Sequence, residues 1–193
     1  DCGQVGAPAT LGALKSITGD FAGAEAAMRV GLRLADARND TALDARRGIL
    51  QNFATFYLDR AQPVDALPLA ERALAVAEAH YGPEAVAMLR EHLTLAAVHT
   101  DLARYPEARR DYVRAAAIDA AHGSSIDVLQ RLRFYLRRAQ LDLKLGDREA
   151  VRSGIAEAER VMADRPKLGY WRGWSARLAC KLDAIEEDWR AAD

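Results

Sequence analysis

Apolar residues recur along most of the chain at spacings of three and four, with polar and charged residues between them. This spacing places one apolar stripe on each segment, which is typical of helices that pack against neighbours. The stripe of residues 103–121 consists of Ala108, Tyr112, Ala115, Ala116 and Ile118. Runs of β-branched residues, from which a sheet would be built, are absent from the sequence. The pattern therefore predicts an all-α fold.

Alanine also recurs at a fixed interval, because Ala24, Ala66 and Ala108 are spaced 42 residues apart in similar helical segments. A fourth copy follows one residue out of step, with Ala150 or Val151 at the matching position. A small residue lets two helices cross at close distance, so its repetition indicates helix pairs that stack with constant geometry. The interval predicts an array of stacked helical hairpins that winds into a superhelix with a concave and a convex face.

A second set of helical segments alternates with the first, and short turns separate them. We expect about nine helices, including a shortened first helix at residues 9–17 and a last helix that begins after Pro166. The chain is interpreted as one domain over residues 1–193. Its predicted parts are a partial first repeat at 9–37, further repeats at 41–80, 84–122 and 126–164, and a C-terminal capping helix at 167–192.

Two repeats end in the same way, with a histidine in the last turn of the helix and a glycine soon after it. The pairs are His80 with Gly82 and His122 with Gly123. Glycine readily adopts the left-handed conformation that ends a helix, and a histidine there can bond the free carbonyl groups. We interpret both histidines as helix caps and not as ligands.

These features resemble the tetratricopeptide repeat, in the long 42-residue form found in kinesin light chains and many bacterial proteins. The resemblance covers about residues 9–165 and depends on the repetition, because each single copy is degenerate. The residues that carry it are Leu95, Ala96, Leu102 to Tyr105, Ala108, Tyr112 and Ala115, with Phe53, Ala54, Tyr57 and Ala66, and with Gly19 to Phe21, Ala24 and Met28. The resemblance implies a right-handed superhelical solenoid of antiparallel helix pairs that recognises proteins or peptides, usually in its concave groove, without catalysis.

The sequence departs from the family pattern at two places. Leu50 or His92 stands where a large aromatic residue is expected early in the first helix of a repeat. The fourth repeat carries Gly154 and Glu157 in register, or Ile155 and Ala158 if the register is shifted. We therefore interpret the fourth repeat as a degenerate terminal one.

The charge balance excludes a general electrostatic attraction to nucleic acid or to membranes. The chain has 27 basic and 28 acidic residues, which gives a formal net charge of −1. No window has the apolar length of a membrane span, and the start of the chain lacks a signal pattern. Cys2 and Cys180 lie near opposite ends and do not suggest a disulfide framework. We expect a cytoplasmic protein, or a fragment of one, that binds neither nucleic acid nor membrane.

The sequence holds no catalytic or metal-binding set. His92 and His99 lie on one helical face, but no clustered Cys or further His supplies the other ligands of a metal site. They occupy positions where this type of repeat packs large side chains against the partner helix. A glycine-rich phosphate loop and a nucleophile elbow are also absent from the sequence. We therefore expect a protein that is not an enzyme and that needs no cofactor or metal.

A polar strip on the first helices of the repeats is the candidate working surface. Its four basic and amide residues, which helical spacing places on one face, are Arg133, Arg137, Gln140 and Lys144. The equivalent positions of the two preceding repeats hold Arg90, Thr94 and Asp101, and then Asn52, Thr55 and Asp59. By analogy with the family this strip lines the groove, where arginines could bind an acidic segment or a chain-terminal carboxylate. The alternative is a solvated face whose charges are balanced by nearby acids.

The run from Arg131 to Arg138 also invites a nucleic-acid interpretation, because arginines with interleaved aromatic residues can hold phosphates and stack bases. However, Leu132, Tyr135 and Leu136 within this run are needed for the core. The neutral overall charge argues against nucleic acid as well.

The last helix is rich in aromatic residues, which are Tyr170, Trp171, Trp174 and Trp189. One interpretation is a capping helix that covers the open end of the array. The other is a surface that binds a partner or forms a homodimer, because exposed aromatic residues mark interfaces.

Together these patterns predict a scaffold that binds proteins or peptides, as the interaction module of a larger bacterial signalling or regulatory protein. The alternative is a regulatory domain whose groove binds a short signal peptide and responds with a change in superhelical pitch. The identity of the partner is not encoded in any motif of the sequence.

Overall fold

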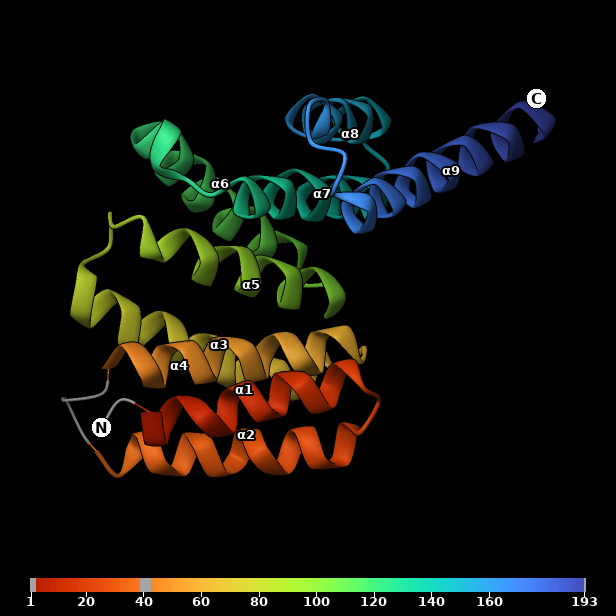
Figure 1. Ribbon diagram of the computed structural model, residues 1–193. Helices are drawn as coiled ribbons and strands as arrows, with labels where there is room; N and C mark the ends of the chain where they lie inside the picture. Colours follow the sequence, from red (N-terminus) through yellow and green to blue (C-terminus); the bar gives the residue numbers. More distant parts are fainter. Residues whose placement is uncertain (1–2, 39–42, 193) are drawn as a thin grey trace. The chain divides into compact units, whose positions relative to one another are not determined.

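The computed structural model describes residues 3–38 and 43–192, which form nine α-helices and one short 3-10 helix (Figure 1). The helices are α1 Gly3–Ile17, α2 Phe21–Asp36, α3 Leu43–Asp59, α4 Pro63–Tyr81, α5 Ala87–Asp101, α6 Tyr105–His122, η2 Gly123–Ser125, α7 Val128–Lys144, α8 Arg148–Met162 and α9 Gly169–Ala192. All the helices expected from the apolar spacing are present, which confirms the all-α fold for the described part of the chain. Cys2, and Thr41 at the start of the predicted second repeat, lie outside the described residues.

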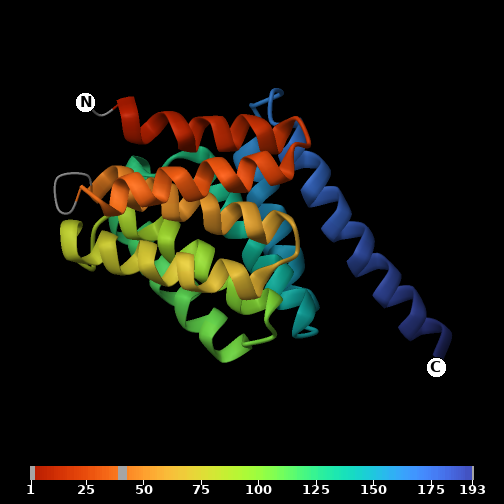
Figure 2. The same cartoon turned by 90° about the horizontal axis from the view of Figure 1, so that it is seen from below.

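The chain divides into two compact units, an N-terminal unit of residues 1–118 and a C-terminal unit of residues 119–193. In the N-terminal unit, α1 pairs with α2 and α3 pairs with α4, and Figures 1 and 2 both show these pairs side by side. In the C-terminal unit, α7 pairs with α8, and α9 packs on both of them. The last turns of α9 extend beyond α7 and α8 (Figure 2). The right-handed winding of the whole array and its single-domain character stay predictions.

The repeating alanine is buried in each of the first three repeats. Ala24, Ala66 and Ala108 are all fully buried. They belong to α2, α4 and α6, which are the second helices of their pairs. The stacking that the interval predicts is therefore built on positions with no room for a larger side chain.

The fourth repeat packs with its register shifted by one residue, which is one of the two alternatives that the sequence predicts. Val151, Ile155 and Ala158 of α8 are buried, whereas Ala150 remains partly exposed. Gly154 lies where α8 crosses α7 closely, because a Cβ atom at this position would lie 3.0 Å from the Cβ of Ala139. The repeat therefore packs in the shifted register, and its glycine serves a close approach of two helices.

The same backbone turn joins the two helices of each pair. The second residue after the first helix has a positive φ in all four turns, at Gly19 (84°), Ala61 (55°), Ala103 (56°) and Gly146 (75°). The next amide reaches back into the helix, as Gln62 N donates to Tyr57 O at 2.9 Å and Asp147 N to Asp142 O at 3.0 Å. This bond ends the helix and satisfies a terminal carbonyl group. Two of the four turns thus place an alanine in a conformation that favours glycine.

The predicted glycines after the second helices also have positive φ, with 81° at Gly82 and 41° at Gly123. The amide of Gly82 donates to Glu78 O at 3.0 Å, so the backbone itself closes α4. His80 is exposed, and its ring lies edge-on against Tyr81. A capping hydrogen bond from either histidine stays a prediction.

The first helix differs from the prediction, because α1 begins at Gly3 and has 15 residues, as many as α5. It is therefore not shortened. The sequence interpretation started it at Ala9, whereas the helix continues through Pro8, a residue that lacks an N–H and crowds the preceding turn. Pro8 lies in the second turn of α1, where it removes only one backbone hydrogen bond, and the packing of α1 along α2 outweighs that loss.

Each unit has its own core. In the N-terminal unit, Phe53, Phe56 and Tyr57 of α3 form an aromatic cluster that packs with Met28 of α2. The core of the C-terminal unit consists of Leu132, Leu136, Ala139, Val151, Ile155, Ala158, Met162, Leu178 and Leu182. Within the described residues, no helix carries an apolar run of the length that a membrane crossing requires.

Candidate functional site

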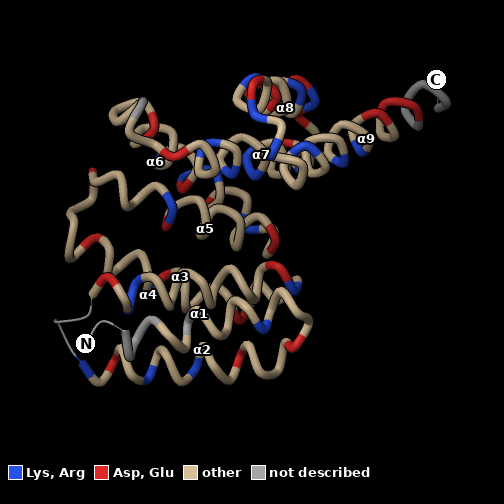
Figure 3. Tube along the Cα trace, in the orientation of Figure 1, with Lys and Arg blue, Asp and Glu red and all other residues tan. Residues whose placement is uncertain are grey.

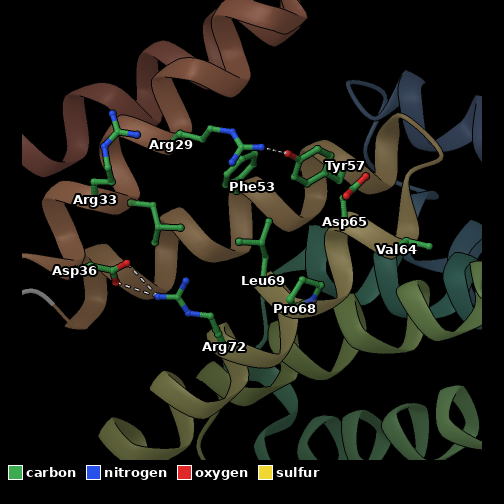
Figure 4. Close-up of a pocket in the computed structure, with 11 residues that line it drawn as sticks. Arg29, Arg33, Asp36, Phe53, Tyr57, Val64, Asp65, Pro68, Leu69 and Arg72 are labelled. Carbon is green, nitrogen blue, oxygen red and sulfur yellow. Dashed lines mark hydrogen bonds and ion pairs between the residues drawn. The ribbon is translucent and has the colours of Figure 1, made fainter.

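An open groove of about 570 Å³ lies between α2 and α4, and α3 forms its floor (Figure 4). This volume is within the range of sites that hold a small molecule or the side chains of a partner. The groove belongs entirely to the N-terminal unit. The sequence analysis did not identify it, because two of its walls are the second helices of consecutive repeats, whereas the predicted strip follows the first helices.

Apolar side chains form the floor of the groove. Phe53 and Tyr57, one turn apart on α3, stack with 4.9 Å between ring centroids and 21° between ring planes. Leu32 of α2 and Leu69 of α4 flank the two rings, and both leucines are partly exposed. Burial of apolar surface is favourable by about 25 cal/mol per Å². The floor therefore suits an aliphatic or aromatic side chain of a partner.

A hydrogen-bonded network fixes the Tyr57 ring in this floor. The Tyr57 hydroxyl donates to Glu25 at 2.9 Å and accepts from Arg29 at 3.2 Å, and Arg29 also binds Glu25 at 2.6 Å. The hydrogen bonds from Arg29 and Tyr57 hold the pKa of Glu25 below its ordinary value. Burial raises the pKa of Tyr57, and its bond to Glu25 raises it further. These three groups satisfy one another, so they position the floor of the groove.

The remaining charged groups of the groove lie at its two ends. Arg72 donates to both carboxylate oxygens of Asp36 at 3.1 Å. Figure 4 shows Arg33 at the same end, and its guanidinium makes no ion pair or hydrogen bond with a described residue. Asp65 lies at the other end beside Val64, and within the described chain its carboxylate has no ion pair or hydrogen bond either. A cation and an anion that form no side-chain ion pair with any described residue thus flank an apolar floor.

This arrangement is suited to binding. An apolar group can occupy the floor, while an acidic group meets Arg33 and a basic group meets Asp65. The described lining of the groove includes no Ser, Cys or His, which are the usual nucleophiles and bases of catalytic sites.

The predicted strip of the N-terminal unit lies largely in a contact between helices. Arg90 of α5 donates to Asn52 of α3 at 2.9 Å. Thr94 is buried and accepts a hydrogen bond from Gln51, so it departs from the expectation of a groove-lining residue. The reason is that α3 and α5 pack against each other, which spacing along a single helix cannot show.

The other members of this part of the strip are less enclosed. The Thr55 hydroxyl donates to the backbone oxygen of Gln51 at 2.9 Å. This bond within α3 uses the only hydrogen that the hydroxyl can donate. Asp59 and Asp101 are exposed at the ends of α3 and α5. Their role in binding stays a prediction.

A buried ion pair in the same contact was missed by the sequence analysis. Glu91 of α5 is fully buried and binds Arg47 of α3 at 2.9 Å. Burial raises the pKa of the Glu91 carboxyl, and the Arg47 guanidinium offsets only part of that effect. A signal was available, because Glu91 occupies an apolar position of its helix, between Met88 and Leu95 at helical spacing.

The predicted strip of the C-terminal unit lies on α7 and meets aromatic residues of α9. The Arg133 Cζ atom lies 5.9 Å from the ring centroid of Trp171, and the Arg137 Cζ atom lies 4.9 Å from that of Trp174. Arg137 also donates to Gln140 at 3.5 Å. Lys144 ends the strip and is exposed. The sequence analysis treated the strip and the aromatic helix separately, and the structure brings them together.

The two histidines on α5 share one carboxylate. His92 Nδ1 lies 3.3 Å from one oxygen of Asp111, and His99 Nδ1 lies 2.9 Å from the other. Burial alone would raise the pKa of Asp111, but its hydrogen bonds with the two histidines outweigh burial and lower it. In the part of the chain that the structure describes, no group of His, Cys, Asp and Glu could hold a metal ion. The three side chains therefore link α5 to α6.

Comparison with known families adds one finding. Residues 47–92 match the family model of the tetratricopeptide repeat. The match spans most of α3, all of α4 and the start of α5, so it supports a tetratricopeptide-type repeat in the segment that forms much of the groove. No curated protein is similar enough in sequence to match the chain. The kinesin-light-chain-like and bacterial character of the repeats stays a prediction.

Proposed function

We propose that the protein is an interaction module that binds a segment of a partner protein in the groove between α2 and α4. The observation that carries this proposal is the apolar floor of the groove, with Arg33 and Asp65 at its ends, neither of which forms a side-chain ion pair or hydrogen bond with a described residue. The tetratricopeptide-type match over α3 and α4 supports it, because such repeats typically bind proteins. The role of this module in a larger bacterial signalling protein stays a prediction from the resemblance.

The charges at the two ends define the partner segment. A large apolar side chain would pack on Leu32, Phe53 and Leu69, which is worth about 1.5–3 kcal/mol when it is fully buried. An acidic residue on one side of it would meet Arg33, and a basic residue on the other side would meet Asp65. Charge of both signs fixes the direction in which the segment lies, because the reversed segment would place like charges together.

A random peptide library displayed on phage and selected on the full chain tests the proposal. The enriched sequences should share an apolar residue with an acid on one side and a base on the other. Arg33→Glu should weaken the selected peptides by about tenfold or more, which corresponds to one charged hydrogen bond and the repulsion that replaces it.

The matched control is Arg110→Glu, which changes the same charge at an exposed position of α6. It should leave the affinity of the selected peptides within about twofold of the original value. Equal affinity of the Arg33→Glu variant, with an unchanged circular dichroism spectrum, would remove the groove as the binding site.

One observation favours the peptide-sensing alternative. The groove is lined by α2 of one helix pair and by α3 and α4 of the next, so a bound peptide would contact both pairs. Hydrogen exchange of the α2 and α4 amides with a selected peptide bound tests it. Protection that spreads beyond the groove favours sensing, and protection confined to the lining favours a scaffold.

A further inference from the structure

A second and smaller pocket lies between α4 and α6, with α5 at its bottom. Its volume is about 120 Å³, and the residues that line it are Leu74 and Glu78 of α4, Pro83 of the following turn, Met88 and His92 of α5, and Arg114 of α6. Every one of these residues belongs to the N-terminal unit. The volume is well below that of pockets for drug-sized ligands, so it suits one small molecule or one side chain.

The pocket occupies the same place in its repeat as the α2–α4 groove does in the preceding one. Three of its lining residues follow three lining residues of the groove by 42 positions each. These pairs are Leu32 and Leu74, Asp36 and Glu78, and Arg72 and Arg114. A leucine, an acid and an arginine therefore recur at both hollows.

The two copies differ in the contacts of the acid. In the groove, Asp36 binds two arginines, at 3.1 Å and 3.6 Å. The second of these is Arg46, and Met88 stands 42 residues later at the matching position. Neither the Glu78 carboxylate nor the Arg114 guanidinium forms an ion pair or hydrogen bond with a described residue. An acid and a base thus line this pocket without contact between them.

Apolar and charged groups occupy different parts of the pocket. Met88 is buried, so the bottom offers apolar surface. His92 forms one side, and its Nδ1 atom lies 3.3 Å from Asp111, which fixes the ring. Glu78 and Arg114 are exposed, so they stand at the rim. The pocket therefore combines an apolar bottom with one acid and one base at its entrance.

The second helices of the N-terminal unit carry charges of both signs. Figure 3 shows basic and acidic residues interspersed along α2, and the sequences of α4 and α6 contain the same mixture. Such a surface has no excess of one sign that would attract a strongly charged ligand. A ligand with one positive and one negative group matches it better.

We infer that this pocket binds a free α-amino acid with a small apolar side chain, such as valine. The ammonium group would meet the Glu78 carboxylate, and the carboxylate would meet the Arg114 guanidinium, whose planar edge matches it. The side chain would lie on Met88 and Leu74, which removes apolar surface from water. The site is separate from the groove, so it does not depend on the proposed function.

Other ligands of similar chemistry fit less well. A side chain with its own charge would place that charge at the apolar bottom without a partner, which is costly. A tryptophan side chain is too bulky for a pocket of this size. The end of a partner protein carries only one of the two charges beside its side chain. Only a free amino acid satisfies the acid and the base together.

NMR of the methionine methyl groups measures this binding in the full chain. The chain has three methionines, Met28, Met88 and Met162, of which Met88 lines the pocket and Met162 lies in the C-terminal unit. We expect L-valine to shift the Met88 signal with half-saturation on the order of 1 mM, because the charged groups at the rim are exposed. The Met162 signal should stay unchanged, and the Met88→Leu variant assigns the reporter.

Two derivatives of valine distinguish a free amino acid from a chain end. N-acetyl-L-valine lacks the ammonium group and resembles a C-terminal residue, whereas L-valinamide lacks the carboxylate and resembles an N-terminal residue. Each should bind about tenfold more weakly than L-valine, because one charged hydrogen bond is lost. L-aspartate should bind as weakly as these derivatives, because its second carboxylate would meet the apolar bottom.

Variants locate the site. Glu78→Gln and Arg114→Gln should each weaken the binding of L-valine by about tenfold. The matched control is Glu71→Gln with Arg109→Gln, which changes an exposed acid of α4 and an exposed arginine of α6 outside the pocket. It should leave the affinity within about twofold of the original value. Unchanged Met162 signals show that each variant is folded.

Three outcomes would overturn the inference. They are the absence of a saturable Met88 shift with L-valine, binding of either valine derivative as tight as that of L-valine, and unchanged affinity in the Glu78→Gln or Arg114→Gln variant. The groove is tested separately by selected peptides and by Arg33→Glu, so the failure of one proposal leaves the other standing.

Discussion

In the N-terminal unit, the polar positions of α3 and α5 face each other, and Arg90 donates to Asn52 across the contact. In the C-terminal unit, the corresponding positions of α7 face the indole rings of α9. The first contact pairs polar groups with polar groups and so uses up their hydrogen bonds. The second contact places guanidinium groups over aromatic rings. The helix that packs against a repeat helix therefore decides whether the polar residues of the repeat helix pair with other polar groups or lie over aromatic rings.

The largest expected effect breaks the polar contact of the N-terminal unit. Glu91→Leu removes the buried partner of Arg47 and leaves it Asp44, an exposed acid at 3.8 Å, and loss of a buried partner typically lowers the free energy of unfolding by about 3–5 kcal/mol. Because Arg47 is partly exposed, we expect the lower end of this range. Urea denaturation followed by circular dichroism measures it. Replacement of both residues by Leu should recover most of the stability, since no buried charge remains.

The equivalent experiment in the C-terminal unit should have little effect on stability. Arg137→Gln removes a cation that has no acidic partner in the described chain, so the free energy of unfolding should change by less than about 1 kcal/mol. A loss as large as that of Glu91→Leu would mean that the α7–α9 contact stabilises the fold in the same way as the α3–α5 contact.

An intermediate effect is expected from acid, through Asp111 of the N-terminal unit. Its folded pKa lies below the ordinary 3.8, so its contribution to stability is present above about pH 4 and is lost as the pH falls through the folded pKa. Asp111→Asn removes this contribution, and the free energy of unfolding of the variant should fall less steeply below about pH 4. Urea titrations at several pH values check this, and equal slopes would contradict it.

Glu91 provides an internal control, because its effect on the free energy of unfolding changes with pH in the opposite direction. Its folded pKa lies above the ordinary 4.5, so the stability that the protonated carboxyl contributes is present below pH 4.5 and is lost as the pH rises through the folded pKa. Glu91→Gln should remove that decline of stability with rising pH.

All three tryptophans lie in the C-terminal unit, so fluorescence follows the unfolding of this unit while circular dichroism follows the unfolding of both.

A similarly small effect concerns the turns, which are the same in both units. Ala61→Gly and Ala103→Gly should each raise the free energy of unfolding by about 0.5–1 kcal/mol, because glycine adopts a positive φ without the strain of a Cβ atom. Gly146→Ala should lower it by a similar amount. Thermal melts in parallel measure all three. A destabilised Ala61→Gly variant would show that backbone entropy outweighs the strain.

The repeat array could be predicted well because its signals are local. The spacing of apolar residues and the alanine interval predict the helices and their pairing, and the burial of Ala24, Ala66 and Ala108 agrees with that prediction. The predicted start of α1 at residue 9 was wrong, because the helix continues through Pro8 to Gly3 and packs along α2. Thr94 shows a similar limit, because its polarity suggested a groove position although a neighbouring helix covers it.

The candidate sites depend on contacts between residues far apart in the chain. The groove joins Leu32, Phe53 and Leu69 of three helices, and no spacing within one helix shows that a hollow lies between them. Arg137 and Trp174 were both noted in the sequence, but their contact results from the packing of α9 on α7.

The sequence by itself determined the helical periodicity, the interval of the repeats and the positions of the turns, because each of these depends on residues within a few turns of one another. Only the tertiary structure decided which polar residues are enclosed and which are presented. That choice depends on the side chain that lies opposite, as Gln51 lies opposite Thr94 and Trp174 opposite Arg137. Such partners are set by how helices pack, and packing is a property of the whole unit.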